Sequence, residues 1–84
     1  MIIPFWDNYL KVDVMEFRLK KLRKQKKITQ IKLAMDLGLT QNSVSRFETG
    51  LRRPDYETLI LIADYFHVSL DYLVGRSDDP HIHK

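Results

Sequence analysis

The sequence has no cysteine, only three glycines and three prolines among its 84 residues, and no long apolar run. Without cysteine it can form neither a disulfide bond nor the ligand set of a zinc finger, and this composition fits a reducing cytoplasm. No apolar stretch approaches the roughly 20 residues of a transmembrane helix, and the first residues lack the charged start and long apolar stretch of a signal peptide. We therefore expect a cytoplasmic protein that does not bind a membrane.

Acidic residues are scarce in one part of the chain. Residues 16–53 carry 11 lysines and arginines against three acids, a net charge of +8, whereas residues 54–84 carry two against six, a net charge of −4. The apolar content of 44% and the charged content of 30% are typical of one small folded domain. This division of charge would orient the protein on a polyanion, with the acidic part held away from it. Ordinary solvation of surface charges accounts for individual lysines, but it accounts less well for the separation of a basic region from an acidic one.

Residues 30–49 predict two short helices joined by a tight turn. Leu33, Ala34 and Leu37 are spaced at i, i+1 and i+4, which places them on one face of the first helix. Gly38 then ends this helix, because glycine takes the left-handed conformation without steric cost. Ala34 is small where the two helices would cross, so the pair can pack steeply, at roughly 90–120°, as in a helix-turn-helix.

The second helix has an apolar side and a polar side. Thr40 can cap its N-terminus, and Val44 and Phe47, three residues apart, face back onto the first helix. The opposite side carries amides, hydroxyls and one guanidinium but no acid: Gln41, Asn42, Ser45, Arg46 and Thr49. Glutamine and asparagine can bond adenine, arginine can bond guanine, and serine accepts several bases. An ordinary solvated helix is the alternative, but we expect four residues to contact bases in a DNA major groove: Gln41, Asn42, Ser45 and Arg46.

This segment resembles the helix-turn-helix of the Cro/CI-type, lambda-repressor-like regulators, also called the XRE family. The matching apolar, alanine and glycine positions are Leu33, Ala34, Leu37, Gly38, Leu39, Val44 and Phe47. The resemblance extends over residues 19–75, because RLKKLRKQKKITQ, RFETGLRRP, LILIADYF and VSLDYLVG also match the family's wider pattern. It implies an all-α, five-helix DNA-binding domain, of bacterial or phage origin, that acts as a homodimer on double-stranded DNA.

The resemblance also implies roles for residues beyond the polar side of that helix. In the family, the arginine matching Arg23 pairs with the acid matching Glu48. This implies a structural ion pair between an earlier helix, which carries Arg23, and the second helix of the helix-turn-helix, which is called the recognition helix. Gln30 is implied to contact a backbone phosphate, at a helix start where free N–H groups favour anions. Two loop arginines resemble basic residues beside the groove, and two lysines are plausible neighbours of phosphates. The expected phosphate contacts are Gln30, Ser43, Thr49, Arg52, Arg53, Lys27 and Lys32.

Two flanking segments surround the predicted helix-turn-helix domain at residues 16–75. Residues 1–15 form an apolar N-terminal extension, and residues 76–84 form a polar C-terminal tail, which we expect to be free of the domain. We expect another helix at about residues 15–26, ahead of the two helices of the helix-turn-helix. The extension is too apolar for a free tail, so we expect it to pack on the domain or on a second subunit.

Two more helices are predicted after the recognition helix. Asp55 and Ser69 can cap them, and His67 ends the first of them as a turn residue. Leu61 lies on that helix, at a position where members of the family are often polar. We therefore expect the N-terminal segment or another subunit to cover Leu61.

The sequence predicts a sequence-specific transcriptional regulator that reads a palindromic operator, with repression as the favoured action. The alternative is an antitoxin-like or adaptor module that uses the same fold to bind a protein. An enzyme is not expected, because there is no cysteine nucleophile and because Ser43, Ser45 and Ser69 are better explained as helix-surface or capping residues. His81 and His83 are too few for a metal site. We expect no cofactor, metal ion or small-molecule ligand.

Overall fold

The computed structural model describes residues 17–82, which form five helices and no strand. The helices are α2 (Leu19–Gln25), α3 (Gln30–Leu37), α4 (Gln41–Thr49), α5 (Tyr56–Phe66) and α6 (Leu70–Leu73). The all-α prediction is therefore confirmed. The predicted N-terminal extension, residues 1–15, lies outside the described residues. Among residues 17–82, none of the helices has the length and apolar character needed to cross a membrane.

Local sequence signals set most of the helix boundaries. Four helices begin with a side-chain oxygen that accepts a hydrogen bond from the backbone N–H three residues later. These caps are Thr29, Thr40, Asp55 and Ser69, with distances of 2.8–3.0 Å. Gly38 and Gly50 end their helices in the left-handed conformation, at φ 72° and 80°, and His67 does the same at φ 55°. The predicted turns at Gly38 and His67 and the predicted cap at Thr40 are confirmed.

The first described helix is shorter than predicted. α2 begins at Leu19, and the backbone N–H of Arg18 donates to the carbonyl oxygen of Leu73 in α6 at 2.8 Å. At the other end, Lys27 takes φ 60° and redirects the chain toward α3. The predicted helix over about residues 15–26 is therefore corrected at its start, although its first two residues lie outside the described part.

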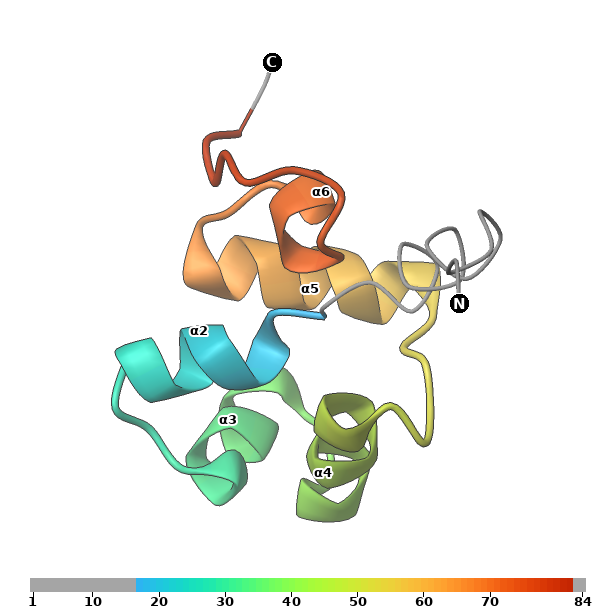
Figure 1. The fold of residues 1–84 in the computed structure, drawn as a ribbon. Coiled ribbons are helices and arrows are strands. Elements are labelled where there is room, and N and C mark those ends of the chain that lie inside the picture. The colour runs from blue at the N-terminus through green and yellow to red at the C-terminus, as the bar shows by residue number, and fades with distance from the viewer. Residues whose placement is uncertain (1–16, 83–84) are drawn as a thin grey trace, which may run out of the picture.

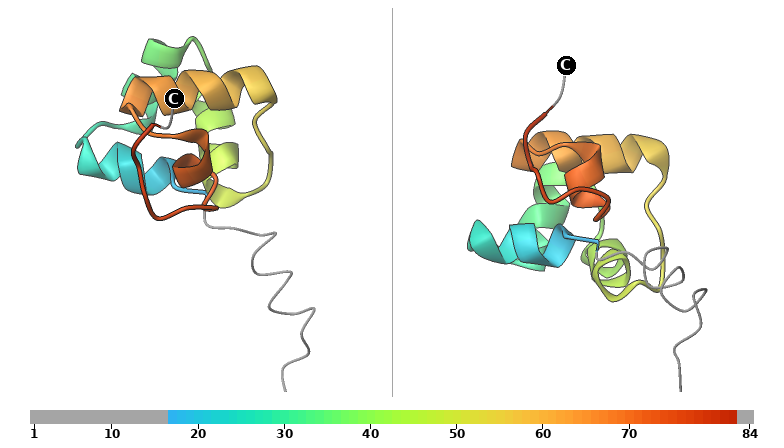
Figure 2. Two further views of the ribbon diagram at one scale, coloured as in Figure 1. Left: turned by 90° about the horizontal axis from the view of Figure 1, so that it is seen from above. Right: turned by 45° about the horizontal axis from the view of Figure 1, so that its top comes forward.

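All five helices or their adjoining turns contribute to one apolar core. Its buried members are Leu19, Leu22, Leu33, Ala34, Val44, Phe47, Ile62, Ala63, Val68 and Leu73. Figures 1 and 2 show α5 crossing the domain, in contact with α3 on one side and with α6 on the other. The small side chain of Ala34 is 3% exposed in α3, and α3 contacts α4. The steep crossing of these two helices stays a prediction.

The segment after α6 is tied to the domain. The backbone N–H of Ser69 donates to the carbonyl oxygen of Pro80 at 3.0 Å. The buried guanidinium of Arg18 donates to the carbonyl oxygen of Ser77 and, at 2.8 Å, to a carboxylate oxygen of Asp78. The polar composition of this segment suggested a free tail, and that expectation is wrong for residues 76–80.

Candidate nucleic-acid interface

The two sides of α4 differ in exposure as the sequence predicts. Val44 and Phe47 are buried in the core, with 0% and 4% exposure. Figure 1 shows that α4 lies at the edge of the domain, so its other side faces outward. That side carries the four predicted base contacts. Gln41, Asn42 and Arg46 are exposed there, and Ser45 is half-buried.

The hydroxyl groups at the two ends of α4 bond to the helix itself. The Thr40 hydroxyl oxygen accepts from the backbone N–H of Ser43 at 3.0 Å and donates to its side-chain oxygen at 3.0 Å. The Thr49 hydroxyl donates to the carbonyl oxygen of Ser45 at 3.1 Å. These bonds fix the hydroxyl groups of Ser43 and Thr49, both predicted phosphate contacts, relative to the helix backbone.

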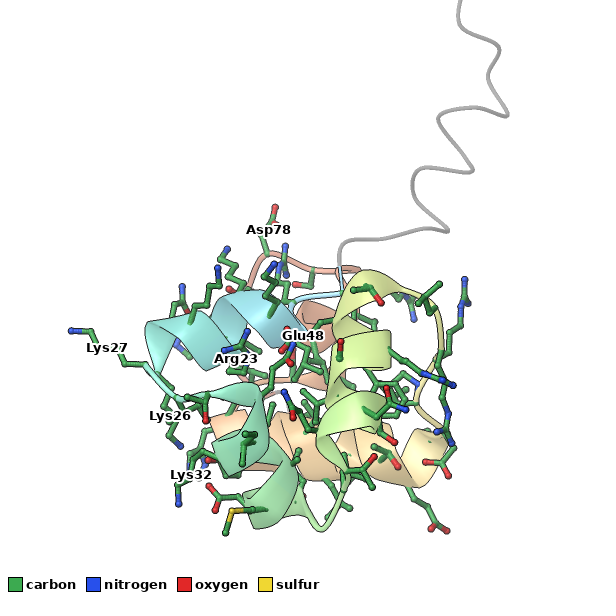
Figure 3. All side chains as sticks on the ribbon, turned by 90° about the horizontal axis from the view of Figure 1, so that it is seen from below. Arg23, Lys26, Lys27, Lys32, Glu48 and Asp78 are labelled. Carbon is green, nitrogen blue, oxygen red and sulfur yellow. The ribbon has the colours of Figure 1, made fainter. Side chains whose placement is uncertain are left out.

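A buried charged group joins α2, α3 and α4. The Nε of Arg23 lies 2.6 Å from Oε2 of Glu48, and a second guanidinium nitrogen lies 3.1 Å from Oε1. The side-chain nitrogen of Gln30 donates to the same Oε1 at 3.0 Å. We call Arg23, Gln30 and Glu48 the inner network. Figure 3 shows its two charged side chains pointing toward each other between the helices, so the implied ion pair is present.

Burial makes the inner network energetically important. The side chains of Arg23 and Glu48 are only 12% and 2% exposed. The hydrogen bond to Glu48 raises the pKa of Arg23 above its ordinary value, against the opposing effect of burial. Arg23 also donates to the carbonyl oxygen of Ile28 at 2.9 Å, which ties the turn before α3 to the same group. A buried carboxylate with several donors holds its helix in place because its charge cannot be left unpaired.

A second charged group, which sequence reasoning missed, joins α3 to α5. The Tyr65 hydroxyl donates to one carboxylate oxygen of Asp36 at 2.6 Å, and the ammonium of Lys32 lies 3.0 Å from the other. The ammonium of Lys26 lies 4.2 Å from the centre of the Tyr65 ring. We call Lys26, Lys32, Asp36 and Tyr65 the outer network. The pairing of Lys32 with Asp36 is the usual i, i+4 helical contact, and that spacing was the available signal.

Hydrogen bonding shifts the pKa of both acidic groups of the outer network, Asp36 and Tyr65. The bond from Tyr65 and then the bond from Lys32 lower the pKa of Asp36, because both stabilise its charged form. The same bond to Asp36 raises the pKa of Tyr65, because it stabilises the protonated phenol. Lys32, a predicted phosphate contact, is therefore already paired within the domain, although its side chain is 58% exposed.

The remaining predicted phosphate contacts lie in exposed turns. Lys27 is exposed in the α2–α3 turn, and Arg52 and Arg53 are exposed in the loop after α4. In Figure 3, Lys26, Lys27 and Lys32 lie at the end of the domain where α2 leads into α3, away from the α4–α5 loop. The exposed polar side of α4 is therefore accompanied by cations at both its α3 side and its loop side. In residues 17–82, no group of three or more histidine or acidic side chains could hold a metal ion.

Comparison with known proteins adds a family match. A model of the helix-turn-helix family matches residues 19–73. The chain is 52% identical to the uncharacterized HTH-type transcriptional regulator YqaE of Bacillus subtilis, over 73% of this chain and 53% of that protein. It is 36% identical to the HTH-type transcriptional regulator ImmR of Bacillus subtilis, over 73% and 48%. It is 37% identical to the antitoxin PezA of Streptococcus pneumoniae, over 69% and 37%.

These matches concern one part of the relatives. The chain spans about half the length of YqaE and of ImmR, and a smaller share, 37%, of the length of PezA. No solved structure matches the chain.

Proposed function

The chain belongs to the XRE, or Cro/CI-type, family of helix-turn-helix transcriptional regulators, and from this premise we propose that it is a sequence-specific DNA-binding repressor. It binds a palindromic operator and places α4 in the major groove. Gln41, Asn42, Ser45 and Arg46 read base edges there. The exposed polar side of α4 supports this proposal more than any other observation, since its opposite side is anchored in the core.

Base reading needs side chains that are free to bond and a helix that is rigidly held. Asn42 and Arg46 are both exposed, and their helix is fixed at its first turn by Thr40 and near its end by Glu48. Arginine is suited to guanine and asparagine to adenine, because each can make two bonds to one base. The proposal therefore assigns discrimination mainly to Asn42 and Arg46.

Phosphate contacts supply the sequence-independent part of the affinity. Arg52, Arg53 and Lys27 are exposed and carry the charge that attracts the backbone. Gln30 has one amide hydrogen directed to Glu48 and keeps a second one for a phosphate. Ser43 and Thr49 flank the groove from the two ends of α4, and Lys32 contributes less than the loop arginines because Asp36 pairs with it.

A homodimer accounts for a palindromic operator. Two copies related by a two-fold axis would place their α4 helices in successive major grooves about 34 Å apart. In the family, the C-terminal end of the domain commonly carries the dimer contact. Repression then follows from occupying a promoter, in the cytoplasm of a bacterium.

Selection of bound duplexes from a random DNA pool, at two salt concentrations, tests the proposal. We expect a palindromic consensus and an affinity that falls steeply with salt, because several phosphates are neutralised. The matched control replaces both Asn42 and Arg46 with alanine, which leaves the core intact. This variant should keep its helical circular dichroism and lose the consensus. Enrichment of no common sequence by the wild-type protein would refute the proposal.

An antitoxin or adaptor role is the second candidate. One relative is named an antitoxin, and two large apolar side chains away from the core, Met35 and Leu61, are 73% and 51% exposed. Copurification of a protein partner in equal amount, together with a failed DNA selection, would favour this role over repression.

A further inference from the structure

Two neighbouring arginines in the loop after α4 differ sharply in their surroundings. Arg52 reaches back along α4, where its guanidinium lies 3.5 Å from the hydroxyl oxygen of Ser43 and its central carbon lies 5.5 Å from the centre of the Phe47 ring. Its backbone N–H also donates to the carbonyl oxygen of Arg46 at 3.3 Å. Within residues 17–82, Arg53 makes no hydrogen bond, ion pair or ring contact. The two arginines carry the same charge, but within the described residues only Arg52 is held by contacts with α4.

The contacts of Arg52 connect the two ends of the recognition helix. Ser43 belongs to the first turn of α4, where Thr40 already bonds to both its backbone N–H and its hydroxyl. Arg52 belongs to the loop that follows the last turn. Thr40, Ser43 and Arg52 thus form a continuous polar chain along the border between the buried and exposed sides of α4.

The guanidinium is suited to this position in a way that an ammonium is not. A planar, delocalised cation can lie over the Phe47 ring while its edge directs an N–H group toward the Ser43 oxygen. The 3.5 Å separation between the guanidinium and the Ser43 oxygen is long for a hydrogen bond. The contact with the Phe47 ring and the hydrogen bond of the Arg52 backbone N–H therefore help to hold the side chain in place. A lysine would keep the charge but lose the fixed fork of donors.

We propose that Arg52 is a positioning residue, which holds a DNA phosphate at a fixed place beside Ser43 and so sets the register of Asn42 and Arg46 on the bases. Arg53 contributes only charge. This inference rests on the proposed DNA-binding function. Phosphate contacts carry no sequence information by themselves, but they fix the orientation in which base contacts are made. A change at Arg52 therefore alters discrimination between sequences, whereas the same change at Arg53 does not.

The test compares Arg52→Lys with Arg53→Lys, since both keep the net charge and lie side by side. Affinities for the selected operator and for an unrelated duplex are measured by fluorescence anisotropy at several salt concentrations. We expect Arg52→Lys to lower the ratio of the two affinities about tenfold, with the salt dependence unchanged because the phosphate is still neutralised. Arg53→Lys keeps the charge that attracts the phosphate backbone, so it should lower that ratio clearly less than Arg52→Lys does. Equal effects of the two variants, or no effect of Arg52→Lys, would overturn the proposal.

A measurement on the free protein separates this proposal from the proposed function. Amide hydrogen exchange at Ser43 and Val44 should become faster in Arg52→Lys than in Arg53→Lys, because the first turn of α4 loses a contact. Faster exchange with an unchanged affinity ratio refutes the positioning role while DNA recognition stands. Absence of any sequence preference in the wild-type protein refutes DNA recognition itself, and the register role with it.

Discussion

The inner and outer networks use the same kinds of groups to join helices, but in different surroundings. The inner network connects α2, α3 and α4 through a carboxylate that is 2% exposed, whereas the carboxylate of the outer network, which connects α3 and α5, is 26% exposed. Both carboxylates accept from a cationic side chain and from a neutral donor. We expect burial, more than the number of bonds, to decide how much each of these ion pairs contributes to the stability of the fold.

Water explains the contrast. An exposed charge that loses its partner is solvated at once, so exposed pairs contribute little to stability. A buried charge that loses its partner has no such alternative, and the domain must unfold locally or bear the cost. The inner network is therefore where α4 depends on its neighbours, and the outer network contributes less to stability.

The largest expected effect comes from removing one partner of the inner network. Arg23→Met leaves the buried carboxylate of Glu48 without its cation, and we expect a loss of about 3–5 kcal/mol in the free energy of unfolding. Urea unfolding followed by circular dichroism measures this loss. The matched control is Lys32→Met, which removes one cation of the outer network and should shift the urea midpoint only slightly. Equal shifts in the two variants would mean that burial does not separate the networks.

A charged residue of α4 that belongs to neither network sharpens the comparison. Arg46 is exposed on the same helix as Glu48, so Arg46→Ala should leave the urea midpoint almost unchanged. It should weaken binding to the selected operator by roughly 1–3 kcal/mol and relax the preference at one base pair. Fluorescence anisotropy with single-base operator variants measures both effects. An equal loss of affinity for random DNA would show that Arg46 contacts only a phosphate.

A smaller effect is expected from the neutral donor of the outer network. Tyr65→Phe removes the hydroxyl that donates to Asp36 and keeps the ring that packs on the core. The urea midpoint should fall less than in Arg23→Met, because water can replace the lost donor at this exposed carboxylate. A fall as large as that of Arg23→Met would contradict the assignment of the outer network as a surface group.

The smallest expected effect is a dependence of stability on pH. The pKa of Asp36 is lowered in the folded protein, so its contribution is fully present above the ordinary carboxyl pKa of about 3.9. This contribution is lost as the pH falls through the lowered value. Urea midpoints measured from pH 7 to pH 3 should therefore decline less at the acid end in Asp36→Asn than in the wild-type protein. The Asp55 cap, whose pKa is also lowered, remains in both proteins as an internal reference.

Local signals in the sequence predicted most of the helix-turn-helix. Capping side chains and glycines act on their own neighbours, so Thr40 and Gly50 define α4 without knowledge of the rest of the chain. The apolar spacing of Val44 and Phe47 likewise predicted which side of α4 is buried. The Arg23–Glu48 pair was expected only because the chain resembles a known family.

Contacts between residues that are distant in sequence were not predictable in the same way. The bond from Tyr65 to Asp36 depends on how α5 crosses α3, which no local pattern specifies. The same limit explains why a polar segment after α6 suggested a free tail, although Arg18 holds it. The expected cover over Leu61, which is 51% exposed in the described domain, stays a prediction because the N-terminal segment lies outside the described residues.

The hold of Arg18 on Asp78 has a consequence for how the chain is arranged. The two residues are 60 positions apart, yet their side chains meet at 2.8 Å, so two parts of the chain near opposite ends of the described domain lie side by side. The order in which the helices follow one another is therefore separable from the way they pack. A chain rejoined across this point by a short linker and opened in the exposed α4–α5 loop would bury the same core.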